Sequence, residues 1–150
     1  MAACIAVMTF VLSGCGADKN LKRAEKFLAI GEYYDAANQF KQAYTKTPPK
    51  ERTQRGQIAL KVALCHERIY ASYRPAAAYA NAIRYKQATP QHRLAYARQL
   101  LKNGQYRQAE QQFKIVLDSM PDDILAKNGL ISAQKAPAWK KEGSRYKVKR

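Results

Sequence analysis

A segment of eighteen residues occurs twice in this chain of 150 residues, and this repetition constrains the fold more than any other feature. The first copy is GEYYDAANQFKQAYTKTP, residues 31–48, and the second is GQYRQAEQQFKIVLDSMP, residues 104–121. Seven of the eighteen positions are identical, among them the opening glycine, one tyrosine, one phenylalanine and the closing proline. The copies begin 73 residues apart, which leaves room for a further copy between them.

Each copy has the periodicity of an amphipathic helix. In the first copy the apolar residues recur at steps of three or four and share one helix face: Tyr33, Ala36, Phe40 and Ala43. The opening glycines, Gly31 and Gly104, are expected in a left-handed turn that ends a preceding helix, and the closing prolines end the second helix. Another amphipathic run precedes each glycine, NLKRAEKFLAI in the first copy and PQHRLAYARQLL in the second. Each unit is therefore predicted to be helix, tight turn, helix.

A weaker unit lies between the two. QIALKVALCHERI predicts its first helix and RPAAAYANAIRYK its second, where Pro75 is tolerable only in the first turn. Equivalent positions Ala43, Ala82 and Val116 are separated by 39 and then 34 residues, which predicts five extra residues in the loop PKERT.

A period of 34 residues with this placement of Gly, Tyr, Ala, Phe and Pro resembles the tetratricopeptide repeat. The resemblance implies an all-α superhelix of three helical hairpins, at about 18–49, 56–88 and 90–121, and then a capping helix at 122–136. Phe40 and Phe113 are expected in the core between repeats, because a single hairpin cannot bury its own apolar stripe. The cap is expected to cover the last repeat with Ile124, Leu125 and Leu130.

The N-terminus has the character of an export signal. Its first twelve residues, MAACIAVMTFVL, are predominantly apolar but too short to cross a bilayer, where about 20 residues are needed. The following LSGC resembles the lipobox of bacterial lipoproteins, although no Lys or Arg precedes the apolar run. The resemblance implies a signal peptide at 1–15, lipidation of Cys15, and a protein anchored in the outer membrane and facing the periplasm. Cys65 would remain as a buried, inert thiol.

The sequence offers no constellation typical of an enzyme. It has two histidines; His66 directly follows Cys65, and adjacent helical residues point about 100° apart, so the two do not form a nucleophile–base pair. Neither the spacing of a zinc protease motif nor a glycine-rich phosphate loop occurs. We therefore predict no catalytic residue, metal, cofactor or small-molecule substrate.

Repeat proteins of this kind bind partners in a groove lined by the first helix of each unit. The resemblance assigns these lining positions: Leu21, Glu25, Leu28, Leu60, Leu64, Glu67, Arg68, Leu94, Arg98, Leu101 and Lys102. Leu21 and Glu25 stand where chaperone-binding members carry the lysine and asparagine of a carboxylate clamp, which argues against such a clamp. Leucine mixed with Arg and Lys suits a partly acidic, amphipathic segment of a partner protein. Alternatively, the leucines pack beneath a neighbouring domain.

The chain is strongly basic, with a formal net charge of +16, which attracts anionic partners. Residues 137–150, with the sequence PAWKKEGSRYKVKR, are predicted to form a basic, extended tail or linker. The order of lipobox, three repeats and this tail resembles the N-terminal part of OmpA-like outer-membrane lipoproteins of Bacteroidota, some associated with type IX secretion. It implies a non-enzymatic scaffold for protein–protein interactions in an envelope assembly, and that the chain is a fragment. The alternative is a soluble basic adaptor for nucleic acid or acidic partners, in which residues 1–15 are no signal.

Overall fold

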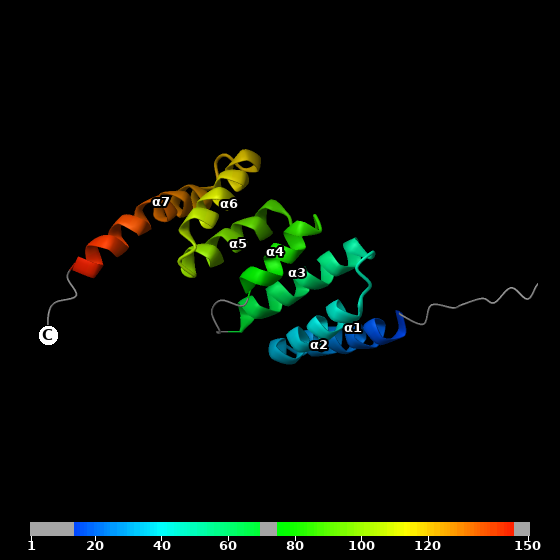
Figure 1. Ribbon diagram of the computed structural model, residues 1–150. Helices are drawn as coiled ribbons and strands as arrows, with labels where there is room; N and C mark the ends of the chain where they lie inside the picture. The colour runs from blue at the N-terminus through cyan, green and yellow to red at the C-terminus, as the bar shows by residue number, and fades with distance from the viewer. Residues whose placement is uncertain (1–13, 70–74, 146–150) are drawn as a thin grey trace, which may run out of the picture.

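The computed structural model describes residues 14–69 and 75–145, and in these ranges the chain forms helices and no strand. The helices are, in order, α1 (Gly14–Ala29), α2 (Tyr33–Lys46), α3 (Arg52–Arg68), α4 (Pro75–Arg84), α5 (Pro90–Lys102), α6 (Tyr106–Ser119) and α7 (Ile124–Arg145). They form three hairpins that stack in chain order, with α1 and α2 at one end and α7 at the other (Figure 1). The predicted all-α architecture of three hairpins and a final helix is confirmed, and Pro75 begins α4 as its chemistry requires.

The turns within the first and third hairpins are built alike. Gly31 has a φ of +81° and Gly104 a φ of +74°, so both lie in the left-handed region as predicted. Gly31 N–H donates to the Leu28 carbonyl and the next N–H to that of Phe27, at 3.1 and 2.9 Å. The bonds at Gly104 follow the same pattern at 3.0 and 2.9 Å. This double bond satisfies carbonyls at the end of the first helix and reverses the chain.

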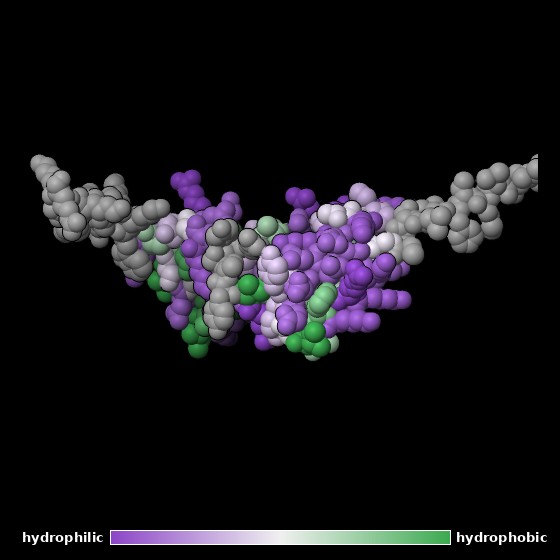
Figure 2. All heavy atoms as spheres, turned by 90° about the horizontal axis from the view of Figure 1, so that it is seen from below, coloured by the Kyte–Doolittle hydropathy of each residue, from purple (hydrophilic) through white to green (hydrophobic). Residues whose placement is uncertain are grey.

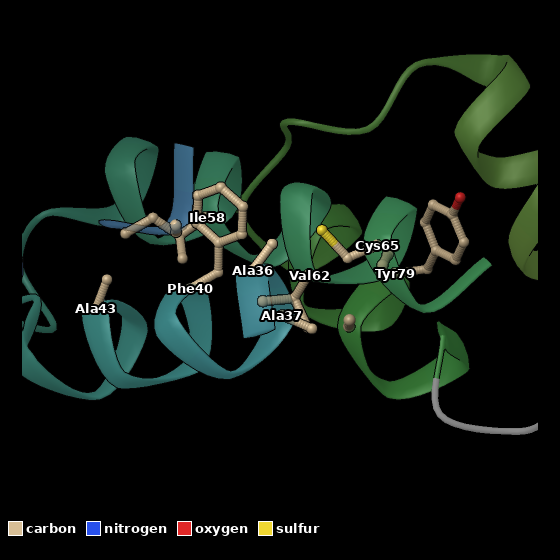
Figure 3. Packing of buried hydrophobic residues seen from close by; sticks show 11 residues of the cluster. Ala36, Ala37, Phe40, Ala43, Ile58, Val62, Cys65 and Tyr79 are labelled. Atoms are coloured by element: carbon tan, nitrogen blue, oxygen red, sulfur yellow. The ribbon is translucent and has the colours of Figure 1, made fainter. Parts of the chain in front are cut away.

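The apolar stripes meet between the hairpins, while the outer surface over α1 and α2 is largely hydrophilic (Figure 2). Phe40 and Phe113 are both fully buried, as predicted. Figure 3 shows Phe40 of α2 beside Ile58 of α3, in a core cluster formed by α1 to α4. Phe113 belongs to a second cluster, formed by α5 to α7, and half-buried Tyr96 packs against both clusters. Burial of each phenylalanine contributes about 1.5–3 kcal/mol.

Arg55 ties the first hairpin to the second. Its Nη1 donates to the carbonyls of Tyr44 and Thr47 at the end of α2, at 3.1 and 2.6 Å, and its Nε donates to the Tyr85 hydroxyl at 3.2 Å. Its guanidinium also lies 4.1 Å from the centroid of the Tyr44 ring, at cation–π distance. One side chain therefore satisfies the carboxyl end of α2 and links it to the residue that follows α4.

The five extra residues of the middle unit do not lie in the loop PKERT, where the spacing placed them. The connections before α3 and before α5 are equally long, at 47–51 and 85–89. Most of the difference lies in α3, which has 17 residues and is four residues longer than α5, with 13. A repeat spacing fixes how many residues are added but not which element absorbs them.

The last helix differs from the expected cap. It does not end at residue 136 but runs to Arg145, so the prediction of extended backbone is wrong for 137–145. Pro137 lies inside the helix, where it removes one backbone hydrogen bond but does not end the helix. The segment KKE that follows consists of good helix formers. Residues 146–150 of the predicted tail lie outside the described residues.

The face that α7 turns toward α6 also differs from the expected one. Ile124 is 71% exposed and Leu125 56%, while the buried residues are Ala126 and Ala133. Of the three expected contacts only Leu130 packs against the cluster. Two causes are visible. The Asp123 carboxylate accepts from the Ala126 N–H at 2.7 Å and fixes the first turn, and Gly129 lets α7 come close to α6.

Gly129 yields the first prediction. A Cβ at this position would lie 2.3 Å from Cζ of Phe113, so Gly129→Ala forces a collision inside the second cluster. We expect it to lower the free energy of unfolding by about 1–3 kcal/mol, even though alanine is intrinsically the better helix former. Urea denaturation followed by circular dichroism measures this.

Asn128→Ala is the matched control, because Asn128 is an exposed neighbour in the same helix, and should change stability by less than about 0.5 kcal/mol. Phe113→Leu combined with Gly129→Ala should cost less than the sum of the single changes. A more stable Gly129→Ala variant would contradict the packing described.

Candidate functional site

The predicted partner-binding residues lie on α1, α3 and α5, the first helices of the three hairpins, and most of the leucines among them pack against the core. Five pack into the two core clusters: Leu21, Leu28, Leu60, Leu94 and Leu101. Leu64 alone among the six remains substantially exposed, at 40%. The other five leucines pack against neighbouring helices of the array.

The charged residue predicted on α1 is engaged with α3. Glu25 forms an ion pair with Lys61, and both side chains are more than two-fifths exposed. An exposed pair of this kind contributes little stability, but it occupies the carboxylate. The α1 part of the predicted groove therefore presents two packed leucines and a paired Glu25.

The structure does bring the remaining four predicted residues together. Between α3 and α5 lies a hollow of about 300 Å³, lined by Glu67, Arg68, Ala95, Arg98, Gln99 and Lys102. The last four of these residues are spaced by three, one and three along α5, so they share one helix face. Ala95 and Gln99 were absent from the predicted set, although the spacing that placed Arg98 and Lys102 in it also covers them.

The hollow carries an excess of positive charge. Three cations share the hollow with one carboxylate, Glu67. Burial, and to a lesser extent the Glu67 carboxylate, raises the pKa of the Tyr79 hydroxyl. The Arg68 guanidinium lies 5.8 Å from the centroid of the Tyr33 ring, where it can still pair with an anion. We call these residues, Glu67, Arg68, Arg98, Gln99 and Lys102, the basic hollow.

Gln99 adds an acceptor or donor to the basic hollow. Its Oε1 is buried and has no hydrogen-bond partner among the described residues. An unpaired buried amide costs free energy, so a polar group that enters the hollow and bonds to it gains affinity. If the side-chain amide rotates by about 180°, Nε2 takes the place of Oε1 and acts as a donor. The arrangement can hold one or two anionic side chains, whereas its volume is too small for a whole helix.

A larger and more apolar hollow of about 620 Å³ lies between α2 and α4, over α3. Its walls include Ala59, Val62 and Ala78, and its rim includes Lys41 and Asn81. The run of alanines in α4 opens this space, because small side chains leave a gap where larger ones would fill it.

The cysteine and the two histidines considered as catalytic or metal-binding candidates lie within or at the start of helices. Cys65 is 1% exposed and His66 is 4% exposed, both inside α3. His92 completes a capping box, in which the Thr89 hydroxyl accepts from the His92 N–H at 3.4 Å and the His92 ring accepts from the Thr89 N–H. Within the described ranges no group of three or more His, Cys, Asp or Glu could hold a metal ion. In the same ranges, none of the helices has the length and apolar character needed to span a membrane.

The signal peptide and lipidation predictions fall largely outside the described part of the chain. Residues 1–13 are not described, and Cys15 lies in the first turn of α1. Both predictions therefore stay predictions of the sequence.

Cys65 yields a second prediction. Burial, and to a lesser extent the Glu25 carboxylate, raise the pKa of its thiol, which lowers the fraction of reactive thiolate relative to an exposed cysteine at the same pH. In a chain carrying Cys4→Ser and Cys15→Ser, we expect Cys65 to react with a disulfide reagent at least about a hundredfold more slowly than in urea. Leu64→Cys with Cys65→Ser is the matched control and should react at an ordinary rate. Equal rates for the two positions would show that Cys65 is accessible.

Comparisons with known proteins leave the family open. A scan against protein-family models found no family that matches this chain, and a search of curated proteins found no match. The tetratricopeptide and OmpA-like resemblances therefore rest on the sequence motifs, and the hairpin architecture is compatible with the first of them.

Proposed function

We propose that this chain is a non-enzymatic scaffold that binds another protein through the basic hollow on α3 and α5. The observation that carries the proposal is the meeting of Arg68, Arg98 and Lys102 around one small cavity, with a single carboxylate among them. These cations come from two hairpins, so their proximity depends on the stacking of the array and not on a local run of basic residues. A partner with a short acidic segment would pair with all three.

The hollow favours a protein partner over a small molecule. It is open and its lining is mainly polar, while ligand pockets for small molecules are largely apolar and enclose most of the ligand. Exposed Leu64, three residues before Glu67, adds an apolar contact at this end of α3. An amphipathic segment with acidic residues on one side and an aliphatic residue on the other satisfies both features.

The proposed place of action is the periplasmic side of the outer membrane, with Cys15 as the lipid anchor. Support comes from the sequence: the apolar run, the LSGC box and the abrupt change to charged residues after Cys15. Two acyl chains suffice for durable attachment, because each buried CH2 contributes about 0.8 kcal/mol. Participation in a secretion assembly rests on the OmpA-like resemblance.

The basic hollow is tested by site-specific photo-crosslinking in envelopes. We place a photoreactive residue at position 95, which lines the same hollow without carrying a charge, and compare this chain with one that also carries Arg68→Glu and Arg98→Glu. We expect the cross-linked product to fall by about tenfold or more, because the substitutions place carboxylates against the acidic segment of the partner, and like charges at an interface repel. A synthetic acidic peptide that contains leucine should compete with the partner and reduce the cross-linked product. The same peptide with Gln in place of Glu should not reduce it.

Matched controls exist on other helices. The photoreactive residue at position 114 should give no such product, and the reversal of Arg84 and Arg107, both exposed, should leave the product at position 95 unchanged. Equal competition by the two peptides, or equal loss with the control reversal, would rule out recognition of an acidic segment by the basic hollow.

The anchor is tested by metabolic labelling with an alkynyl fatty acid. We expect the chain to be labelled, Cys15→Ala to lose the label completely, and Cys65→Ala to keep it, because lipidation requires the thiol at the lipobox. In-gel fluorescence after coupling to a dye measures this. Absence of label from the unchanged chain, or label that survives Cys15→Ala, would refute the lipoprotein assignment.

A further inference from the structure

The outer face of α1 carries a row of cations that the proposed function does not use. Lys19, Lys22, Arg23 and Lys26 are all exposed, and their spacing of three, one and three places them on one side of the helix. The opposite side of α1 is buried against α2 and the first cluster, through Ala17, Asn20 and Ala24 among others. We call the four cations the α1 stripe.

The α1 stripe is not neutralised from within. None of its four cations forms an ion pair with a carboxylate of the described residues, whereas Glu25 on the neighbouring face pairs with Lys61 of α3. The acidic residue nearest in sequence is Asp18, beside four positive charges. Like charges at these spacings on a helix repel one another, so the arrangement lowers the stability of α1 in isolation.

An exposed apolar patch continues the α1 stripe. Ile30 lies four residues after Lys26 on the same side of the chain and is 72% exposed, and nearby Tyr34 is 58% exposed. A hollow of about 370 Å³ is lined by Arg23, Lys26, Phe27, Ile30 and Gln39, and nearly all of the atoms that line it are carbon atoms of these side chains. Figure 2 shows the surface at this end of the molecule as largely hydrophilic with a small hydrophobic patch.

We propose that the α1 stripe and Ile30 form a docking surface for a bilayer rich in anionic phospholipids. The cations are complementary to headgroup phosphates, and Ile30 and Phe27 can enter the boundary between headgroups and acyl chains. A nucleic-acid backbone offers the same phosphate charge but no apolar layer for Ile30, which is why the observations favour a membrane. The surface goes beyond the basic hollow, which lies on other helices, and it does not require lipidation of Cys15.

Docking in this way would set the orientation of the array. Because α1 and α2 are at one end and α7 at the other (Figure 1), contact through the outer face of α1 holds the first hairpin at the membrane. An anchor at residue 15 would act at the start of the same helix, so the lipid and the α1 stripe would bind the same surface. A lipid chain alone leaves the protein free to rotate about its attachment, whereas a second contact restricts it.

The test is vesicle flotation with the full chain carrying Cys15→Ser, which removes any acyl group. We compare vesicles of phosphatidylcholine with vesicles that contain about one third phosphatidylglycerol, where each cation near the surface contributes about fivefold to partitioning. Lys19→Gln, Lys22→Gln, Arg23→Gln and Lys26→Gln together should lower the partition coefficient on the anionic vesicles at least about tenfold. Added salt should have a similar effect on the unchanged stripe, through screening.

The matched control removes the same charge elsewhere, with Arg107→Gln, Lys114→Gln, Lys127→Gln and Lys135→Gln on α6 and α7, and should lower partitioning much less. A second measurement is independent of the N-terminal apolar run. With Ile30→Trp and Trp139→Phe, the fluorescence should shift to the blue on anionic vesicles, and the fourfold glutamine variant should not show the shift.

Equal losses for the two fourfold variants, or no blue shift at position 30, would overturn the proposal, because binding would then reflect net charge alone. A DNA duplex is the competing ligand. The proposal would also be overturned if the chain bound the duplex as tightly as the anionic vesicles, lost this binding in the fourfold glutamine variant, and kept it with Ile30→Gln. Circular dichroism of each variant confirms that the exposed substitutions leave the helices intact.

Discussion

A helical hairpin with one apolar stripe cannot bury that stripe by itself, and this constraint organises the whole structure. Phe40 in the first hairpin and Phe113 in the third lie at the same point of the repeated segment, and each is completely buried by the helix that follows its own hairpin. For Phe40 the covering helix is α3, with Ile58, and for Phe113 it is α7, with Gly129. Stability therefore comes from contacts between neighbours, as in other linear arrays. This is why the last helix is needed although it belongs to no repeat.

The core is nevertheless not continuous along the array. Buried residues of α1 to α4 form one cluster and those of α5 to α7 form another. Half-buried Tyr96 packs against both, and the Tyr79 and His92 rings stack across the same junction at 6.4 Å between centroids. The second hairpin is the weakest copy in sequence, with Pro75 and a run of alanines in α4. The position equivalent to Phe40 and Phe113 holds Tyr79, which is also fully buried. Helices α4 and α5 share a smaller contact than the other consecutive helices do, so we expect opening between them to cost the least free energy.

How much of this could be predicted depends on whether a residue's role is local. Gly31 and Gly104 were predictable because a left-handed turn excludes most side chains, and Phe40 and Phe113 because the apolar period points to one face. The groove was predictable only in part. Leu94 and Arg98 share a helix face by spacing alone, yet Leu94 is buried in the second cluster and Arg98 lines the hollow, and this distinction depends on how α5 is rotated against α3 and α6. The same holds for α7, where a glycine that appears unfavourable for a helix is required by the Phe113 ring of another helix.

The two proposed surfaces share no residue, because one lies on α1 and the other on α3 and α5. The basic hollow needs residues of α3 and α5 brought together by stacking, whereas the α1 stripe is defined within one helix and needs only that its opposite side be packed. Four unpaired cations on adjacent turns repel one another, and the chain has a carboxylate, Glu25, on the same helix that pairs instead with Lys61. Because this repulsion lowers the stability of α1, we infer that the arrangement serves binding to an anionic surface outside the molecule. In the proposal, a membrane at the first hairpin would supply that surface, while the basic hollow on α3 and α5 would bind the protein partner.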